Sequence, residues 1–190
     1  MIVRTSLLAS LAFASLPALA DWSVAPESVV TFQTSKNTNI TETHRFKKVS
    51  GSVTDSGAAM VSIDLSSIDS GIEIRDQRMK TMLFNTGTFT TANFQAMLPK
   101  GTLAKLEEGH SETFKLSGSL SLHGERKSLS TDVIATPAQD GKLVVSTLTP
   151  IMLSASDFSL TSGIESLRQV AGLNAISTTV PVNFTLVLNP

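Results

Sequence analysis

The chain has 190 residues and carries 15 Lys and Arg against 16 Asp and Glu, so its formal net charge is -1 at pH 7. This balance provides no strongly cationic surface, and we expect neither nucleic acid nor an anionic membrane as a partner. The lack of cysteine excludes disulfide-stapled scaffolds and thiolate metal sites.

The N-terminal segment, MIVRTSLLASLAFASLPALA, has the layout of a secretory signal peptide. Arg4 precedes an apolar stretch over residues 7–16, and Ala18-Leu19-Ala20 is a small-x-small cleavage signal. The stretch is shorter than the roughly 20 residues that cross a bilayer, and no longer apolar segment follows it. We therefore expect cleavage between Ala20 and Asp21, a periplasmic location, and one mature domain over residues 21–190 that can bury its own core.

Alternation of apolar and polar residues predicts most of the secondary structure. Val61, Ile63 and Leu65 share one face of a segment whose other face is polar, and apolar residues alternate in the same way over residues 180–188. We predict eight strands, near residues 22–34, 45–54, 58–66, 91–105, 111–123, 126–137, 142–157 and 175–189. Many short strands at this spacing indicate an all-β sandwich or barrel.

Two segments have a helical spacing instead. Between residues 75 and 84, Met79, Met82 and Leu83 recur three and four positions apart, and residues 164–170 show a weaker pattern of the same kind. The sequence therefore predicts an all-β domain with one or two short helices.

A charged cluster stands just before the first of these helical segments and has two interpretations. Arg75 and Arg78 provide guanidinium groups that can hold an anionic head group such as a carboxylate or a diphosphate. Alternatively, Arg75 and Asp76 pair with backbone groups and order the loop before the helix, while Arg78 lies in water. Both interpretations fit the sequence.

Large apolar side chains suggest how the interior is built. The chain has nine Phe and no Tyr, so its aromatic rings bring no hydroxyl group that a dry interior would have to satisfy. A barrel of about eight strands is just wide enough either to be filled by its own side chains or to hold one ligand. The candidates for pocket-lining residues are Phe32, Phe46, Met79, Met82, Phe84, Phe89, Phe94 and Phe158.

No motif for catalysis or for metal binding is visible. His44, His110 and His123 lie far apart, and none has another histidine two or four positions away, so we expect no metal and no cofactor. A nucleophile elbow and a glycine-rich phosphate loop are also missing. We expect a protein that is not an enzyme; an enzymatic alternative would use His44 or His123 with a nearby carboxylate as an acid–base pair.

Several motifs in order along the chain resemble the YceI-like family of periplasmic lipid-binding proteins. Ala25 and Glu27 stand where that family commonly has Asp and His, and Thr90 replaces its usual Pro. The resemblance is carried by the opening segment 22–32, FKKVSG at 46–51, RDQRM at 75–79, the Phe-rich run 84–94, the Gly-Leu hairpin pattern 118–127, and Asp157-Phe158.

The resemblance implies an extended, lipocalin-like antiparallel barrel of eight strands with a long apolar cavity. It implies a polyisoprenoid, an isoprenoid quinone or a fatty-acid derivative as ligand, a possible homodimer, and a place for Arg75 and Asp76 in a loop and short helix beside the barrel. It carries over no catalytic residue. We therefore expect a carrier of one long apolar lipid; the alternative is a non-catalytic envelope interaction or stress protein whose barrel is filled by its own side chains.

Overall fold

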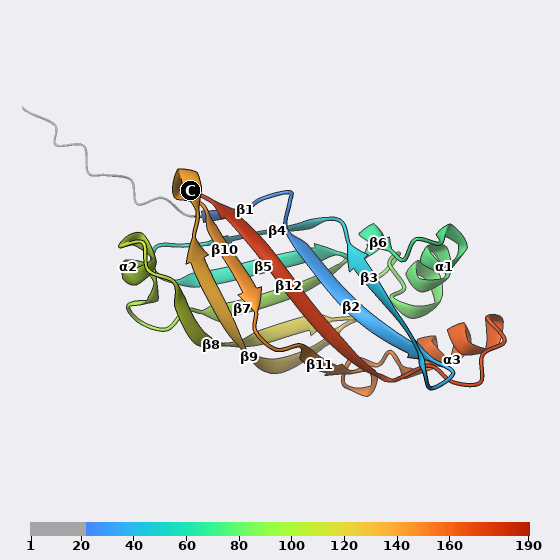
Figure 1. Ribbon diagram of the computed structural model, residues 1–190. Coiled ribbons are helices and arrows are strands. Elements are labelled where there is room, and N and C mark those ends of the chain that lie inside the picture. Colours follow the sequence, from blue (N-terminus) through green and yellow to red (C-terminus); the bar gives the residue numbers. More distant parts are fainter. Residues whose placement is uncertain (1–21) are drawn as a thin grey trace, which may run out of the picture.

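The computed structural model describes residues 22–190, which form an elongated barrel with short helices at both ends (Figure 1). The predicted signal peptide and its cleavage site lie outside the described residues. Within residues 22–190, no helix is both long enough and apolar enough to span a membrane.

The barrel is built from eight long antiparallel strands, of which four are interrupted. The interrupted strands are β1 (Trp22–Val24) with β2 (Val29–Lys36), β3 (Ile40–Phe46) with β4 (Val49–Val53), β5 (Ala58–Asp64) with β6 (Ile68–Asp69), and β10 (Leu143–Thr147) with β11 (Ile151–Ser154). The continuous strands are β7 (Thr91–Met97), β8 (Glu112–Leu122), β9 (Glu125–Pro137) and β12 (Thr179–Asn189).

Hydrogen bonding between the first and last strands closes the sheet. The pairing runs β1-β4-β5-β7-β8-β9-β10-β12, and β12 returns to β1 with Ser23 opposite Asn189. Further along, β12 also pairs with β2, with Phe32 opposite Val182, and β2 pairs with β3. The predicted all-β, eight-stranded antiparallel barrel is confirmed.

Two helical segments lie at one end of the barrel (Figure 1). They are α1 (Glu73–Arg78), which continues into a π-helical turn η2 (Met79–Leu83), and α3 (Thr161–Val170). Gly163 of α3 lies against this turn so closely that a Cβ there would be 2.7 Å from the carbonyl oxygen of Met82. Glycine is thus required for the contact between α3 and η2.

A third helix, α2 (Thr102–Glu107), covers the opposite end of the barrel (Figure 1). Short 3₁₀ turns complete the fold at η1 (Leu65–Ser67), η3 (Gln139–Gly141) and η4 (Ala155–Phe158).

The structure corrects the predicted strand over residues 91–105. Strand β7 ends at Met97, and its expected second half is the turn that precedes α2 and then α2 itself. Pro99 cannot donate to a strand ladder, and Gly101 has a φ of 84°, so the chain leaves the sheet between them. Smaller corrections are the breaks within the other predicted strands and the start of α3 at Thr161, before the predicted residue 164.

Candidate functional site

A cavity of about 520 Å³ occupies the interior of the barrel. Its wall includes Leu103 and Leu106 on α2 at one end and Ile74 on α1 and Val170 on α3 at the other, so the cavity extends along the whole barrel. This volume lies within the range of about 300–1,000 Å³ that is usual for small-molecule sites. The hollow interior argues against a barrel filled by its own side chains.

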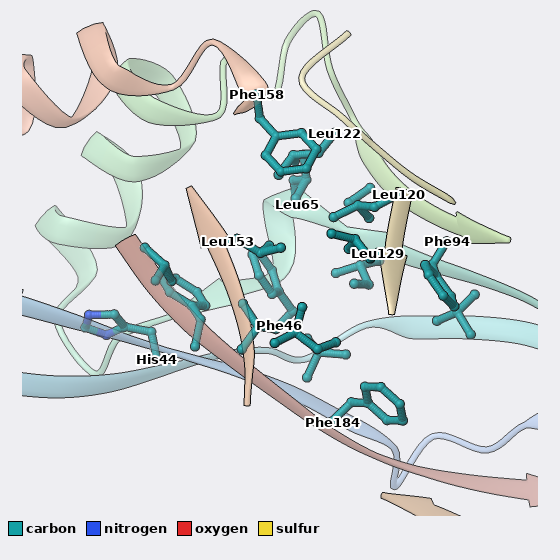
Figure 2. Close-up of a pocket in the computed structure, with 18 of the residues that line it drawn as sticks. His44, Phe46, Leu65, Phe94, Leu120, Leu122, Leu129, Leu153, Phe158 and Phe184 are labelled. Carbon is teal, nitrogen blue, oxygen red and sulfur yellow. The ribbon is translucent and has the colours of Figure 1, made fainter. Parts of the chain in front are cut away.

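The wall of the cavity is almost entirely apolar because alternate residues of each strand point inward. Val180, Val182, Phe184, Leu186 and Leu188 of β12 all line it, as their period-two spacing predicts. Figure 2 shows side chains from several strands that face the same space, together with Phe158 from η4. Such a surface favours a ligand that is itself hydrocarbon.

Gly118 keeps part of this space available. It lies on β8 between the inward-facing residues Leu116 and Leu120, and a Cβ at this position would come within 2.5 Å of the Phe94 ring. The missing side chain lets the Phe94 ring lie close against β8, where it forms part of the wall.

Most of the predicted pocket residues lie on the wall, namely Phe32, Phe46, Met79, Phe84, Phe94 and Phe158. Met82 and Phe89 lie elsewhere. In the π-helical turn, Met79 is buried whereas Met82 is 36% exposed, because the two side chains leave the turn in different directions. The Phe89 ring packs on the ring of His123, with 4.4 Å between their centroids.

One end of the cavity, which we call the opening, is lined by exposed apolar residues. Ile72 is 48% exposed, Ile74 is 59% exposed and Val170 is 44% exposed, although all three belong to the wall. The charged lining residues are at this end too: Lys36 on β2, Glu42 on β3, and Arg75 and Arg78 on α1. The opposite end lies under α2, where Leu106 is only 4% exposed.

Glu42 is the centre of an ion-pair network at the opening. Its Oε2 atom lies 2.8 Å from Nζ of Lys36 and 2.8 Å from Nη1 of Arg75. Hydrogen bonds from Lys36 and then from Arg75 lower the pKa of Glu42 to about 2. The network ties the β2–β3 hairpin to α1 across the opening.

Arg75 and Asp76 both contact Ser70 in the loop before α1. Arg75 donates from Nε to the Ser70 hydroxyl oxygen at 2.8 Å and from Nη2 to the Ser70 carbonyl oxygen. Oδ1 of Asp76 accepts from the Ser70 backbone N–H at 2.8 Å and also from its hydroxyl group. These are the contacts that a loop-ordering pair would make, and together with the ion pair to Glu42 they engage all three nitrogen atoms of the Arg75 guanidinium.

Arg78 differs from Arg75 in its surroundings. Its half-buried side chain reaches the wall of the cavity, and within residues 22–190 it forms no ion pair and no side-chain hydrogen bond. Of the two arginines in the predicted loop or head-group set, Arg78 is therefore the one whose guanidinium has no side-chain partner in the described part of the chain.

His44 is a buried polar residue of the wall that the sequence did not single out as part of a pocket. It is 2% exposed, its Nε2 lies 2.8 Å from Oγ1 of Thr34, and its ring packs on Phe32 at a centroid distance of 5.2 Å. Its Nδ1 atom has no hydrogen-bond partner within the described chain. Burial, together with the nearby charge of Arg75, lowers the pKa of His44.

The enzymatic alternative required a carboxylate next to His44 or His123. Nδ1 of His123 lies 3.2 Å from the carbonyl oxygen of Phe158, and Nε2 of His44 contacts a hydroxyl group. Neither histidine hydrogen-bonds to a carboxylate within residues 22–190. The same part of the chain contains no group of three His, Asp or Glu residues that could hold a metal ion.

The barrel has counterparts among known protein families and solved structures. A family model for the YceI-like domain matches residues 22–188. A polyisoprenoid binding domain from Saccharophagus degradans, implicated in plant cell wall breakdown, is 36% identical, with a TM-score of 0.84 over 90% of this chain and 98% of that chain. A comparison with curated proteins found no match.

Two further structures support the fold alone. BcnA from Burkholderia cenocepacia is 21% identical, with a TM-score of 0.62 over 84% of this chain and 95% of that chain. The YCEI protein from Campylobacter jejuni is 16% identical, with a TM-score of 0.54 over 77% of this chain and 84% of that chain. With its barrel, its apolar cavity and a family match over nearly all of the described residues, the chain belongs to the YceI-like domain family.

Proposed function

We propose that the protein is a periplasmic carrier that binds one long apolar lipid inside its barrel. The ligand class is a polyisoprenoid, an isoprenoid quinone or a fatty-acid derivative. The observation that carries the proposal is the apolar cavity of about 520 Å³ that extends from α2 to the opening. The name of the Saccharophagus degradans relative, a polyisoprenoid binding domain that is 36% identical, supports the same ligand class.

The affinity would come mainly from the wall. Burial of each methylene group contributes about 0.8 kcal/mol, so a long chain binds tightly without many polar contacts. A site of this kind distinguishes between ligands by the length and shape of their apolar chains more than by their chemical reactivity. Binding requires neither a cofactor nor a catalytic group. The protein would thus store or transfer its lipid unchanged.

The direct test is to identify what the protein carries. We expect an organic extract of the purified protein to contain a long-chain apolar lipid by mass spectrometry, and the delipidated protein to take up a fluorescent prenyl or acyl probe. A protein that is purified empty and takes up neither probe would refute the proposal.

A pair of neighbouring residues on β11 provides a matched control. Leu153 lines the cavity, whereas Met152 points to the outside and is 59% exposed. Leu153→Ala should weaken binding of the probe because it removes apolar contact area from the wall. Met152→Ala should leave the affinity unchanged, and equal effects of the two substitutions would argue against binding inside the barrel.

A further inference from the structure

His44 is a polar exception in the apolar cavity. Its imidazole ring comes from β3 and lies in the wall beside the aromatic side chains (Figure 2). Thr34 satisfies Nε2, but Nδ1 is buried and has no partner within residues 22–190. A buried nitrogen without a partner lowers stability, so such atoms are rare in folded proteins unless a ligand or a water molecule satisfies them.

The position of His44 fits the head group of a lipid. Polarity in the cavity is graded: the charged lining residues stand at the opening, and the rest of the wall is mostly apolar, with a few uncharged hydroxyl groups such as those of Ser52 and Thr131. His44 lies between the two regions, next to Phe32 on one side and within the electrostatic influence of Glu42 and Arg75 on the other. A lipid with its chain toward α2 would place its first polar atom at this boundary.

The chemistry of His44 favours an uncharged head group. Because burial lowers its pKa, the ring is neutral near neutral pH and offers no positive charge to an anion. If the Thr34 hydroxyl donates to Nε2, then Nδ1 carries the proton and donates to a carbonyl oxygen. If Thr34 accepts instead, Nδ1 accepts from a hydroxyl group.

We propose that Nδ1 of His44 forms a hydrogen bond with an uncharged oxygen of the bound lipid, a hydroxyl or a carbonyl group, and so fixes the head group near the opening. This inference rests on the proposed function, because it assigns the orientation and head-group class of a lipid held in the same cavity. It predicts that the protein distinguishes prenyl alcohols and prenylquinones from a plain hydrocarbon of equal length.

The rival assignment is an anionic head group held by Arg78. The Arg78 side chain reaches the wall at the opening and makes no ion pair within the described residues. An anion would bind nearer the solvent than His44, and its affinity would depend on Arg78 and on salt concentration. The two assignments therefore make different predictions for different head groups.

The experiment compares ligands with one prenyl chain and different ends: geranylgeraniol, a prenylquinone with the same chain, the corresponding hydrocarbon, and geranylgeranyl diphosphate. We expect the delipidated wild-type protein to bind the alcohol or the quinone about tenfold more tightly than the hydrocarbon, the scale of one buried hydrogen bond. His44→Phe keeps a ring beside Phe32 and should abolish this preference without weakening hydrocarbon binding. Met152→Ala, on the outer face of β11, is the control that should keep it.

Two results would overturn the inference. One is a preference for the alcohol or the quinone that persists in His44→Phe; the other is tightest binding of the diphosphate that is lost in Arg78→Gln. If wild-type protein binds none of the four ligands, this inference is wrong; if it also takes up no acyl probe, the proposed function is wrong as well.

A spectroscopic measurement covers the case in which His44→Phe does not fold. The ¹⁵N resonance of His44 Nδ1 in wild-type protein should shift when geranylgeraniol or the quinone is added, because the nitrogen gains a hydrogen bond. The hydrocarbon should not produce this shift. Equal shifts with all ligands would contradict a direct contact.

Discussion

Asp76→Ala tests whether the charged cluster before α1 serves stability. In the structure, Oδ1 of Asp76 accepts two hydrogen bonds from Ser70, one from the backbone N–H at 2.8 Å and one from the hydroxyl. The substitution removes both and leaves the half-buried Ser70 N–H without its partner. We expect a loss of about 1–3 kcal/mol in the free energy of unfolding, which is the usual scale for charge-assisted hydrogen bonds that are partly exposed to solvent.

Urea denaturation can measure this loss. The chain has one tryptophan, Trp22, which is 8% exposed and belongs to the same core cluster as Leu106 of α2, so its fluorescence should report global unfolding. For a domain of this size, about 1 kcal/mol corresponds to roughly 2–4 °C in Tm, so thermal unfolding provides a second readout. Gln77→Ala is the matched control, because Gln77 is the exposed neighbour of Asp76 on the same helix.

The lipid affinity of Asp76→Ala distinguishes the two interpretations of the cluster. If Asp76 orders the loop, stability falls while the affinity for a prenyl probe, measured well below the unfolding transition, stays near the wild-type value. A variant that is as stable as Gln77→Ala but binds the probe more weakly would refute the loop-ordering interpretation.

Three other predictions concern the cavity and its opening. Gly118→Val should lower the capacity for prenyl probes, because a side chain there meets both the Phe94 ring and the backbone carbonyl oxygen of Gln95, so the ring and β7 must shift; unchanged uptake by a variant that urea denaturation shows to be folded would argue against a rigid wall. Leu103 lies on α2 and lines the end of the cavity that this helix covers, so the larger side chain of Leu103→Trp should shorten the space available to the ligand. The longest prenyl chain that binds should then be shorter than in wild type, as a chain-length series read by mass spectrometry would show. The pKa of Glu42 is lowered from 4.5 to about 2 by hydrogen bonds from Lys36 and Arg75, so these contacts stabilise the fold above pH 4.5 and lose their effect as the pH falls toward 2. The stability difference between wild type and Glu42→Gln should therefore shrink over that interval in urea titrations.

The strands could be predicted from the sequence because the barrel has two distinct surfaces. Residues 180–188 alternate since every second side chain faces the apolar cavity and the others face outward. Phe32, Phe46 and Phe94 lie on the wall for the same reason. This alternation can be read along a single strand. A strand can therefore be recognised without knowing which other strands pair with it.

The second half of the predicted strand over residues 91–105 was wrong although the signal for the end of the strand was present. Pro99 and Gly101 interrupt the ladder, and Leu103 and Leu106 follow with the spacing of a helix face. The apolar content of the segment favours a continued strand, but its breakers end the strand. Local turn chemistry would have located α2 correctly.

Other features depend on contacts that no local pattern encodes. Arg75 meets Glu42 across 33 positions of sequence, and only the pairing of β2 with β3 and the docking of α1 bring them together. His44 likewise is a lone histidine among polar residues in the sequence. Its burial, its contact with Thr34 and its unpaired nitrogen appear only when the barrel closes around it.

The placement of α2 over one end of the barrel has a kinetic consequence. If a chain leaves only past Ile72, Ile74 and Val170, its methylene groups must pass into water one after another before it escapes. At about 0.8 kcal/mol each, every two additional methylenes slow spontaneous dissociation by about tenfold. A long lipid would then remain bound almost indefinitely in free solution, and its delivery would require direct collision of this end of the protein with an acceptor that shields the emerging chain.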